Sequence, residues 1–540
     1  MAAINGSTVA DRIQVTAGTL LLNGNVNPST AAETSITLNS GGTLGGTGVW
    51  KATLTQTGGI LSPGGAAPLA IDTLTLSNDL IVTGGSLLVN MNPVTQTNDV
   101  LNVTRSANIN GATILISPTT KDAPLQNAST RVLDMSGTRT GQYAAAGFFF
   151  ETGSTDGGNL VATSGTGAFV SSTVSLNVEN GTDVRDQNVS VVHHYHTVPG
   201  LSSFGTQFGA SLNNRVAETL NNSNPVLADF LGFLDYSDGA TVAATLNSYE
   251  AAYLQSSMAS MVVSAREIHR IVEQQNAGDR LFPSDAHAWV NFNYNDLSNT
   301  GSSSRYTLGG GGVIDGIHIG ALISQGYADV SNSSDISTLS YGVYLGTGAA
   351  TEWQVNAYFG GSNGKTNINR NISVFSQADP EGQGMQGVLS GAYMMEQGSC
   401  LWGPTFGIEY SSATMDRNSI TPSANLPAMS FDADKLESFR LLLGGRADFN
   451  FDSNIRPYVS AQWAHEFIGD SDGYRATFQG GSFNVNTPYS LATDAIIVRA
   501  GIVVGLGKSW FGDLGYMGEY SINGDGEDFS GVNLGLRASF

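Results

Sequence analysis

From Trp289 to Phe540, apolar and polar residues alternate with a period of two, which is the pattern of β-strands that have one apolar face. Residues 496–506 and 531–540 show this alternation clearly. The polar positions hold mostly Gly, Asn, Ser and a few Arg, whereas the open face of a water-soluble sandwich would be rich in Lys and Glu. Such polar positions suit a narrow hydrated lumen, and the apolar positions suit lipid. The pattern therefore predicts an antiparallel transmembrane β-barrel over residues 285–540.

Twelve alternating segments occur in this region. They are centred near residues 292, 308, 322, 343, 356, 390, 407, 443, 461, 500, 515 and 534. Each strand with its connection takes about 21 residues, close to what a tilted strand of about ten residues and a turn or loop require. Because the number is even, the last strand ends where the first begins. Outer loops are predicted at 366–383, 412–434 and 469–493, and inner turns at 452–454 and 507–509.

Several side chains of the predicted barrel can be assigned to a place in it. By alternation, Arg499, Asn533 and Arg537 are expected to face the lumen. Aromatic residues near the strand ends fit the girdles that barrels carry at the two membrane surfaces. These residues are Trp289, Trp402, Tyr458, Trp463, Trp510 and Tyr520.

A different repeat occupies residues 1–200, which are rich in Gly, Thr, Ser and Asn. A short unit of the type Gly-Gly-Thr-Leu recurs at intervals of roughly 17 to 27 residues, the length expected of one coil of a stacked β-solenoid. The units are 17–20, 41–44, 58–61, 84–87 and 111–114. Each coil would turn at Gly or Asn and point alternate apolar residues inward, so that stacking supplies the core. We therefore expect a right-handed parallel β-helix; a Gly-rich β-sandwich is the alternative.

Residues 201–284 carry apolar residues at helical spacing and are predicted to form an α-helical linker. Shorter helices are expected at 213–220, 226–234 and 242–254, with breaks at Pro225 and Gly239. The clearest helix spans residues 258–277, with an apolar stripe from Met258 to Val272 and Gly278 as its C-cap. The charged residues that fall mainly outside this stripe are Arg266, Glu267, Arg270 and Glu273.

Composition narrows the class of protein. The 540 residues carry 23 Lys and Arg against 45 Asp and Glu, and a net charge of −22 argues against binding to nucleic acid or to an anionic membrane face. The single cysteine, Cys400, excludes an intrachain disulfide. No run of 18 apolar residues predicts a transmembrane helix. The first residues lack the basic and apolar segments of a secretion signal, so export would require that the natural chain begin further upstream.

Several short motifs carry a family resemblance. In the second half they are Arg456-Pro457-Tyr458-Val459, Trp463-Ala464-His465-Glu466-Phe467, Gly505-Leu506-Gly507 before Ser509-Trp510-Phe511, and a last strand ending in Phe540. Earlier motifs are Leu246-Asn247-Ser248-Tyr249 in the helical block and Leu61-Ser62-Pro63-Gly64 among the repeats. In this order along the chain, they resemble the type V secretion autotransporters. The resemblance divides the chain into a β-helical passenger stem at 1–200, a helical linker at 201–284 and an autotransporter β-domain at 285–540.

The resemblance implies an outer-membrane barrel of a Gram-negative bacterium that exports its own N-terminal passenger to the cell surface. It also implies that the helix at 258–277 lies in the finished lumen, where Arg266 and Arg270 would meet luminal acids and the helix would plug the pore. A barrel-assembly machine would recognise the terminal strand. That signal would comprise Leu534, Leu536, Ala538 and Phe540.

The implied partners are outer-membrane lipid with lipopolysaccharide, the barrel-assembly machinery, periplasmic chaperones and a host or surface ligand of an adhesin-like or virulence-type passenger. A monomer without a cofactor is expected. One alternative is a secreted or surface solenoid enzyme, such as a carbohydrate lyase, for which the barrel is only an anchor. Residues 1–200 offer scattered Asp and little Lys instead of clustered carboxylates, which favours a transporter over an enzyme. A porin-like pore is a third possibility, but porins lack a preceding helix and solenoid.

Three motifs invite a chemical interpretation. Gly-x-Ser-x-Gly occurs at 360–364 and 469–473, but at strand ends instead of in a strand-turn-helix setting, so no catalytic residue is assigned. His193-His194-Tyr195-His196 could bind a metal, yet strand alternation brings at most two of its imidazoles to one face, so no metal ligand is assigned. Some relatives cleave the passenger next to an Asn in the lumen. Asn213 and Asn214 offer such a site, although far from the luminal helix.

Overall fold

The computed structural model describes most of the chain, which divides into two compact units. The units are Met1–Ser248 and Tyr249–Phe540, and each is described by itself. The described residues are 2–30, 32–64, 70–148, 171–251, 253–281, 285–297, 301–331, 334–347, 352–368, 380–423, 425–433, 435–450, 454–471, 473–485, 489–524 and 528–540.

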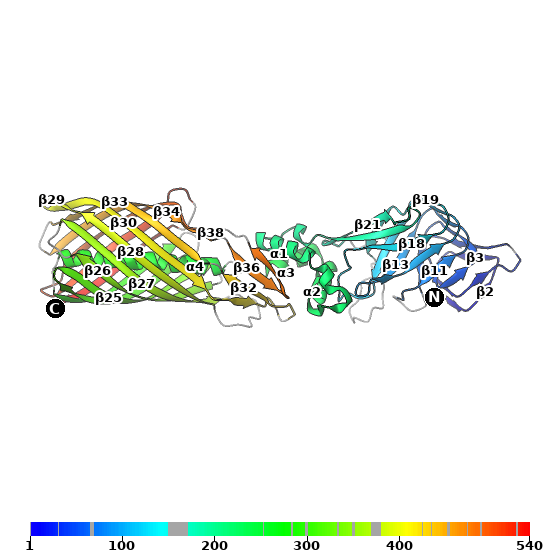
Figure 1. Cartoon of the computed structure of the whole chain (residues 1–540), viewed down its shortest axis with the longest axis horizontal. Helices are drawn as coiled ribbons and strands as arrows, with labels where there is room; N and C mark the ends of the chain where they lie inside the picture. The colour runs from blue at the N-terminus through cyan, green and yellow to red at the C-terminus, as the bar shows by residue number, and fades with distance from the viewer. Residues whose placement is uncertain are drawn as a thin grey trace. The chain divides into compact units, whose positions relative to one another are not determined.

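The first unit begins with a parallel β-helix built from three sheets (Figure 1). The first sheet contains, in spatial order, β1 (Ala2–Asn5), β4 (Gly18–Asn23), β7 (Gly42–Gly46), β10 (Ile60–Pro63), β13 (Ser86–Asn92), β17 (Thr113–Pro118) and β20 (Ala145–Phe148), with β14 (Thr97–Asn98) beside β13. The second contains β2 (Thr8–Val9), β5 (Val26–Asn27), β8 (Gly48–Trp50), β11 (Thr73–Leu76), β15 (Val100–Val103), β18 (Ser129–Met135), β22 (Gln187–His193) and β21 (Val174–Asn180). The third contains β19 (Arg139–Gly141), β16 (Ala107–Ile109), β12 (Leu80–Val82), β9 (Ala52–Gln56), β6 (Thr34–Leu38) and β3 (Arg12–Val15).

The register of the first sheet explains why the sequence repeat forms coils. Leu44 pairs with Leu61, Leu61 with Leu87, and Leu87 with Ile114, so the last residue of each predicted unit stacks on that of the next. These four side chains are fully buried in one apolar core. The predicted parallel β-helix is confirmed, and the β-sandwich alternative is wrong because successive coils pair in parallel.

A glycine in the left-handed region of φ begins or precedes each strand that carries the repeat. At Gly85, φ is +92°, and an added β-carbon would lie 2.6 Å from the carbonyl oxygen of Gly59. Only glycine enters this conformation without a steric penalty. The recurring Gly of the sequence unit is therefore a corner of the coil.

The solenoid ends where β21 and β22 pair in an antiparallel manner. Five short helices follow, η1 (Tyr195–Thr197), α1 (Ser203–Asn213), η2 (Val216–Asn222), α2 (Pro225–Asp235) and α3 (Gly239–Asn247). The side chains of Ser202, Asn224 and Asp238 cap α1, α2 and α3 by accepting a backbone N–H of the first turn. Pro225 and Gly239, predicted as breaks, are the first residues of α2 and α3.

The second unit contains a closed ring of twelve antiparallel strands (Figure 1). They are β23 (Ala286–Leu297), β24 (Gly301–Ile314), β25 (Ile317–Ser331), β26 (Ser334–Thr347), β27 (Trp353–Ile368), β28 (Glu381–Tyr393), β30 (Cys400–Met415), β33 (Leu436–Phe449), β34 (Ile455–Ile468), β39 (Asp494–Gly505), β40 (Trp510–Ser521) and β41 (Phe529–Ser539). The short β29 (Met395–Gln397) pairs with β30. Because β41 pairs with β23, the ring has no free edge, and the predicted barrel is confirmed.

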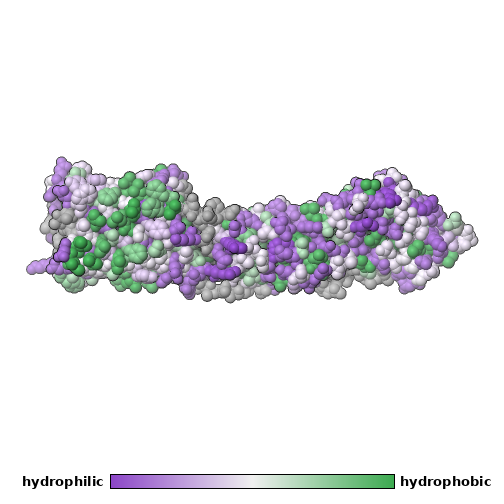
Figure 2. Space-filling view, viewed as in Figure 1, coloured by the Kyte–Doolittle hydropathy of each residue, from purple (hydrophilic) through white to green (hydrophobic). Residues whose placement is uncertain are grey.

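The two faces of the ring differ as the alternation predicts. In β23, Asn291, Asn293 and Asn295 are buried and face the lumen, while Val290 and Tyr294 are exposed on the outer surface. Figure 2 shows the resulting apolar surface over the barrel strands. The outer surface of the ring therefore matches lipid, and the inner surface matches polar partners.

Not all predicted girdle aromatics face outward. Trp402, Trp510 and Tyr520 are exposed on the outer surface, in agreement with the prediction. Trp289 instead points inward, is 3% exposed and donates its indole N–H to Tyr344 Oη at 3.1 Å. Tyr458 lines an internal cavity. A position near a strand end does not determine the face of the barrel, because the face depends on parity along the strand.

The helix α4 (Tyr253–Leu281) runs inside the ring (Figure 1). It begins before and ends after the predicted span of 258–277, and Gly278 lies within it. An apolar stripe marks only the part of a helix that packs on apolar neighbours. The barrel wall surrounds α4, so polar residues such as Arg266 are buried together with Ile268. Among the described residues, no helix is both long and apolar enough to cross a membrane.

The connections differ in length between the two ends of the barrel. At the short-turn end, where β23 begins and β41 ends, neighbouring strands are joined by turns such as Asp315–Gly316 and the predicted turn at 507–509. Of the other predicted turn, 452–454, only Asn454 is described. At the long-connection end, the connections include 369–380, 416–435 and 469–493.

Two of the three predicted outer loops instead contain strands. The sheet that we call the cap sheet contains β31 (Asn418–Ile420), β32 (Met429–Ala433), β36 (Tyr474–Phe478) and β37 (Gly481–Val485), and a separate pair contains β35 (Asp470–Ser471) and β38 (Tyr489–Ser490). These strands were missed because their alternating apolar residues, such as Met429 and Phe431, form only short runs within polar segments. The third predicted loop, 366–383, takes in the ends of β27 and β28, and its residues 369–379 lie outside the described part.

Candidate functional site in the barrel lumen

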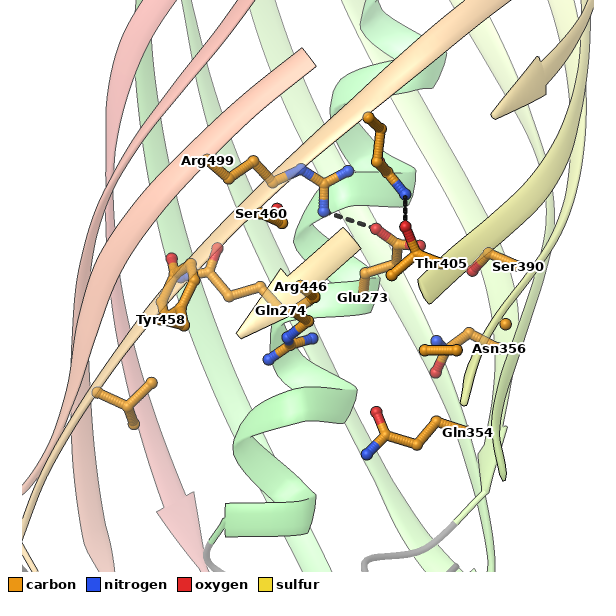
Figure 3. A pocket seen from close by; sticks show the side chains of 14 residues that line it. Glu273, Gln274, Gln354, Asn356, Ser390, Thr405, Arg446, Tyr458, Ser460 and Arg499 are labelled. Atoms are coloured by element: carbon orange, nitrogen blue, oxygen red, sulfur yellow. Dashed lines mark hydrogen bonds and ion pairs between the residues drawn. The ribbon is translucent and has the colours of Figure 1, made fainter. Parts of the chain in front are cut away.

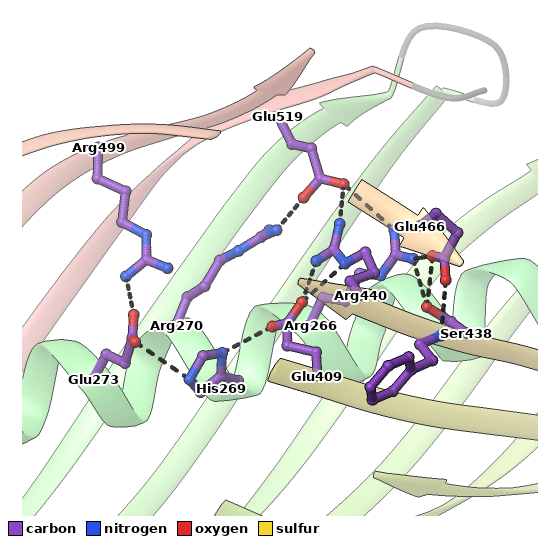
Figure 4. A network of polar contacts seen from close by, with 11 residues as sticks. Arg266, His269, Arg270, Glu273, Glu409, Ser438, Arg440, Glu466, Arg499 and Glu519 are labelled. Atoms are coloured by element: carbon purple, nitrogen blue, oxygen red, sulfur yellow. Dashed lines mark hydrogen bonds and ion pairs between the residues drawn. The ribbon is translucent and has the colours of Figure 1, made fainter. Parts of the chain in front are cut away.

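Buried ion pairs join α4 to the inner wall of the barrel (Figure 4). Arg266 of α4 donates to Glu466 Oε2 of β34 at 2.7 Å and to Glu519 Oε1 of β40 at 3.3 Å. Ser438 of β33 donates to the same oxygen of Glu466 at 2.7 Å. Each of the three charged side chains is at most 5% exposed. Arg266 therefore ties the helix to two strands at once.

Glu519 is a common partner of three arginines. Besides Arg266, it accepts from Arg270 of α4 and from Arg440 Nη1 of β33, the latter at 2.7 Å. Arg440 Nε in turn donates to Glu409 Oε2 of β30 at 2.9 Å. The carboxylates of β30 and β40 are thus linked through one strand arginine to the arginines of the helix.

The contacts continue along the helix toward its C-terminal half. His269 Nδ1 lies 2.8 Å from Glu409 Oε1, and its Nε2 lies 3.4 Å from Glu273 Oε1. Glu273 Oε2 accepts from Arg499 Nη1 of β39 at 2.6 Å. A further pair joins Glu267 Oε2 of α4 to Arg305 Nε of β24 at 3.0 Å.

The formal charges of this cluster balance. We define the ion-pair network as His269 together with four arginines, Arg266, Arg270, Arg440 and Arg499, and four glutamates, Glu273, Glu409, Glu466 and Glu519. An uncompensated buried charge costs several kcal/mol, so each member requires its partners in place. A slide of α4 by one turn, about 5.4 Å, would separate them. The network therefore fixes the rotation and height of the helix in the lumen.

The remaining predicted luminal residues also meet the helix. Asn533 Nδ2 donates to Gln274 Oε1 of α4 at 3.0 Å and to Asp513 Oδ1 at 2.9 Å. Arg537 Nη1 donates to the carbonyl oxygen of Gln275 at 3.4 Å. The structure thus brings Arg499, Asn533 and Arg537 together with α4 on the inner face.

A small polar cavity of about 60 Å³ remains beside Glu273 (Figure 3). Its basic groups are each matched by an acid, since Arg446 donates to Asp448 at 2.8 Å and Arg499 to Glu273. Such a neutral, polar space suits a few water molecules. It lies between α4 and the barrel wall.

The predicted assembly signal lies on or next to β41. Leu534, Leu536 and Phe540 are 59%, 39% and 78% exposed, and Ala538 is partly exposed. The alternate residue Arg537 faces inward. These apolar side chains are therefore presented on the outer surface of the closing strand, and their role as a signal remains a prediction.

Sequence reasoning expected acidic partners in the lumen but did not identify them. The charged residues that it missed are His269, Arg305, Glu409, Arg440, Glu466 and Glu519. A signal was present, because a charged residue at an inward-facing position stands out in a strand with few charges. Glu409, between Ile408 and Tyr410, is an example.

The histidine cluster in the first unit has separate contacts. β22 ends at His193 and η1 begins at Tyr195, so the motif lies at the end of a strand and strand alternation does not extend through it. His193 Nε2 lies 2.9 Å from Asp235 Oδ2, and Tyr195 Oη donates to Asp235 Oδ1 at 2.8 Å. Burial raises the pKa of the Tyr195 phenol well above its usual value, which keeps it a donor. No three His, Cys, Asp or Glu side chains of the described residues are grouped to hold a metal.

The remaining motifs are not brought into the lumen network. Asn213 ends α1 and accepts from the backbone N–H of Tyr195 at 2.9 Å; with Asn214 it belongs to the first unit, whereas α4 belongs to the second. Ser362 of 360–364 lies within β27, which is not the strand-turn-helix setting of a nucleophile. The second match, 469–473, is described only in part.

A closed ring with an apolar outside, a polar inside and a helix held in its lumen defines the class of outer-membrane β-barrels with a plugged pore. Residues 285–517 match the model of the Autotransporter beta-domain family. Residues 285–517 of the second unit are thus an autotransporter β-domain, and this barrel is an outer-membrane translocator.

Solved structures similar to this chain include three autotransporter barrels. The translocator domain of NalP from Neisseria meningitidis is 15% identical, with a TM-score of 0.42, over 53% of this chain and 99% of that one. The transport unit of AIDA-I from Escherichia coli is 14% identical, with a TM-score of 0.35, over 48% and 91%. The β domain of the Bordetella autotransporter BrkA is 16% identical, with a TM-score of 0.35, over 47% and 100%. No curated protein matches the chain.

Proposed function

We propose that the barrel exports the first unit of its own chain and displays it on the cell surface. The observation that carries this proposal is the path of the chain. α4 ends at Leu281, shortly before β23 begins at Ala286 at the short-turn end. Its 29 residues span about 44 Å, longer than the roughly 30 Å of a bilayer's hydrocarbon core. The chain that connects the first unit to the barrel therefore runs the length of the lumen.

The lengths of the connections indicate which end faces outward. Outer-membrane barrels have short periplasmic turns and longer extracellular loops. By this rule the short-turn end faces the periplasm, and the first unit is connected at the extracellular end. The exposed apolar surface of the strands contacts lipid, including lipopolysaccharide of the outer leaflet.

The driving force that we propose is folding of the solenoid outside the cell. Stacked coils bury residues such as Leu61 and Leu87 completely, and burial of a leucine side chain contributes about 1.5–3 kcal/mol. Each coil that stacks outside thus opposes return through the pore. Assembly of the barrel itself would depend on the barrel-assembly machinery and periplasmic chaperones, and we expect Phe540→Ser to lower the amount of assembled barrel.

Surface digestion of intact cells tests the export function. The full chain, preceded by a functional secretion signal, is expressed in a Gram-negative host, and proteinase K is added outside. We expect the first unit to be digested or released while a periplasmic marker stays intact. A matched chain without residues 529–540 cannot close the ring and should leave the first unit inaccessible. Digestion only after permeabilisation of the outer membrane would refute the proposal.

For the displayed unit we propose an adhesin-like role. Its outward strand positions form rows of small polar residues, in which Ser35 pairs with Thr53, Thr37 with Thr55 and Thr75 with Asn102. Such rows offer many hydrogen-bonding groups and few charges, which suits broad contact with a polar surface better than hydrolysis by clustered carboxylates. Displaying cells should bind immobilised polysaccharide or host cells more than cells with the same barrel but without residues 1–200. Equal binding would contradict this role.

A further inference from the structure

The cap sheet has one apolar face that is covered completely. The covered side chains are Ile420, Met429, Phe431, Tyr474, Ala476, Phe478 and Val485, each at most 4% exposed. Alternate residues such as Asp432, Arg475 and Ser482 are exposed on the opposite face. The strands come from two different connections of the long-connection end and are joined by the pairing of β32 with β36.

The covered face packs on the segment of chain just before α4. The ring of Tyr249 meets the ring of Phe478 edge to face, with centroids 5.7 Å apart. Tyr249 Oη donates to the carbonyl oxygen of Pro427 at 2.8 Å. The backbone N–H of Ala251 donates to Tyr474 Oη at 3.4 Å. Both Tyr249 and Ala251 are fully buried.

These contacts couple the cap sheet to the position of the chain. Strands of three to five residues form a stable sheet only when their apolar face is packed against a partner. While another segment of the chain passes through the pore beside residues 249–251, the space under the cap sheet is not free and the cap cannot close. The aromatic pair between Tyr249 and Phe478 forms once residues 249–251 alone remain at the long-connection end, where Figure 1 shows β32 and β36 beyond the barrel strands.

We propose that the cap sheet is a latch that closes on residues 249–251 when export is complete and shields the junction between the passenger and the luminal helix. This proposal rests on the export function proposed above. The latch holds the chain through an aromatic contact and hydrogen bonds between uncharged groups, whereas the ion-pair network holds α4 through charges. The two sets consist of different residues, so they can be opened separately.

Thiol labelling of the full chain in outer-membrane vesicles tests the latch. In a background with Cys400→Ser, Ala251→Cys places a single thiol under the cap, and its reaction with a membrane-impermeant maleimide is timed. We expect Phe478→Ala to raise the labelling rate at least tenfold. Thr477→Ala, on the opposite face of the same strand, should change it less than twofold, and Phe478→Leu should lie between. Heat-modifiable migration in gels verifies that each barrel is folded.

Conductance separates the latch from the plug. In planar bilayers, Phe478→Ala should conduct no more than the unchanged chain, because the ion-pair network remains in place. An unchanged labelling rate in a folded Phe478→Ala barrel would overturn the latch. A pore that opens together with the cap would also overturn it, since the cap would then be part of the plug. Failure of the export function would appear differently, as a first unit protected from external proteinase K in every variant, including the unchanged chain.

Discussion

Replacing Glu519 by glutamine tests whether charge balance keeps α4 in the lumen. The Glu519 carboxylate contacts the guanidinium groups of Arg266, Arg270 and Arg440, and these four side chains are between 2% and 5% exposed. Glutamine has nearly the same shape but no charge. The variant would leave the network with one arginine in excess.

The size of the effect follows from burial. Removing one partner of a buried ion pair costs about 3–5 kcal/mol. Glutamine retains one acceptor oxygen, so the lower end, about 3 kcal/mol, applies. Because every 1.4 kcal/mol is a tenfold change in an equilibrium constant, the ratio of open to plugged barrels should rise roughly a hundredfold.

Single-channel recording of the purified full chain in planar bilayers measures this ratio as the fraction of time in the conducting state. The matched control is Glu437→Gln on β33, which removes a carboxylate from the exposed pair with Lys435. An exposed pair contributes about 0–1 kcal/mol, so this control should open little more than the unchanged chain. Adding Arg270→Gln to Glu519→Gln restores neutrality and should partly close the pore again.

The reasoning fails if Glu519→Gln opens the pore no more than Glu437→Gln does. It also fails if the variant with both Glu519→Gln and Arg270→Gln opens the pore by the sum of the effects of the two single variants. Charge balance would then have no role.

Three further predictions concern the solenoid. Gly85→Ala should destabilise the first unit by about 1–3 kcal/mol in urea unfolding, because φ of Gly85 is +92° and the added β-carbon would meet the carbonyl oxygen of Gly59. Gly111→Ala should cost less, because Gly111 has φ +74° and open space around it. Equal losses of stability in the two variants would contradict this reasoning. Leu74→Ala, at a fully buried position, should cost about 2–5 kcal/mol, and Ile81→Ala, at 37% exposure, much less, as measured by the same unfolding midpoints. Hydrogen bonds from Ser106 hold the pKa of Asp79 below its usual value. Asp79 therefore stabilises the folded unit at pH values above its pKa in the unfolded chain, and this contribution is lost as the pH falls through the lowered pKa. Asp79→Asn should weaken the dependence of stability on acid, and parallel profiles of stability against pH for the variant and the unchanged chain would refute this.

The regular parts of both units could be predicted from sequence because each has one dominant period. Leu44, Leu61 and Leu87 recur once per coil, and the register of the first sheet aligns them. Alternation in residues 531–540 gives the two faces of β41, and its pairing with β23 closes the ring. In both cases a local pattern and the packed structure follow the same geometric rule.

Contacts between distant segments could not be predicted in the same way. Arg266 pairs with Glu466 and Glu519, which lie 200 and 253 residues further along the sequence. No sequence period links positions so far apart. The full length of α4 was hidden because a helix surrounded by a barrel needs no continuous apolar stripe. The cap sheet was missed since its strands pair across two connections, which a pattern within either one does not reveal.

The pairing of β23 with β41 also determines when the barrel of a newly made chain can close. His287 of β23 pairs with Ser539 of β41, so the ring cannot close before the chain has been synthesised as far as β41. At roughly 5–20 residues per second, this interval lasts about 13–50 seconds. Throughout it, β23 exposes an edge that invites pairing with the wrong neighbour. β23 is therefore complete long before its partner β41 has been made. A cell that produces this protein needs a chaperone that shields the free edge of β23 until β41 is available.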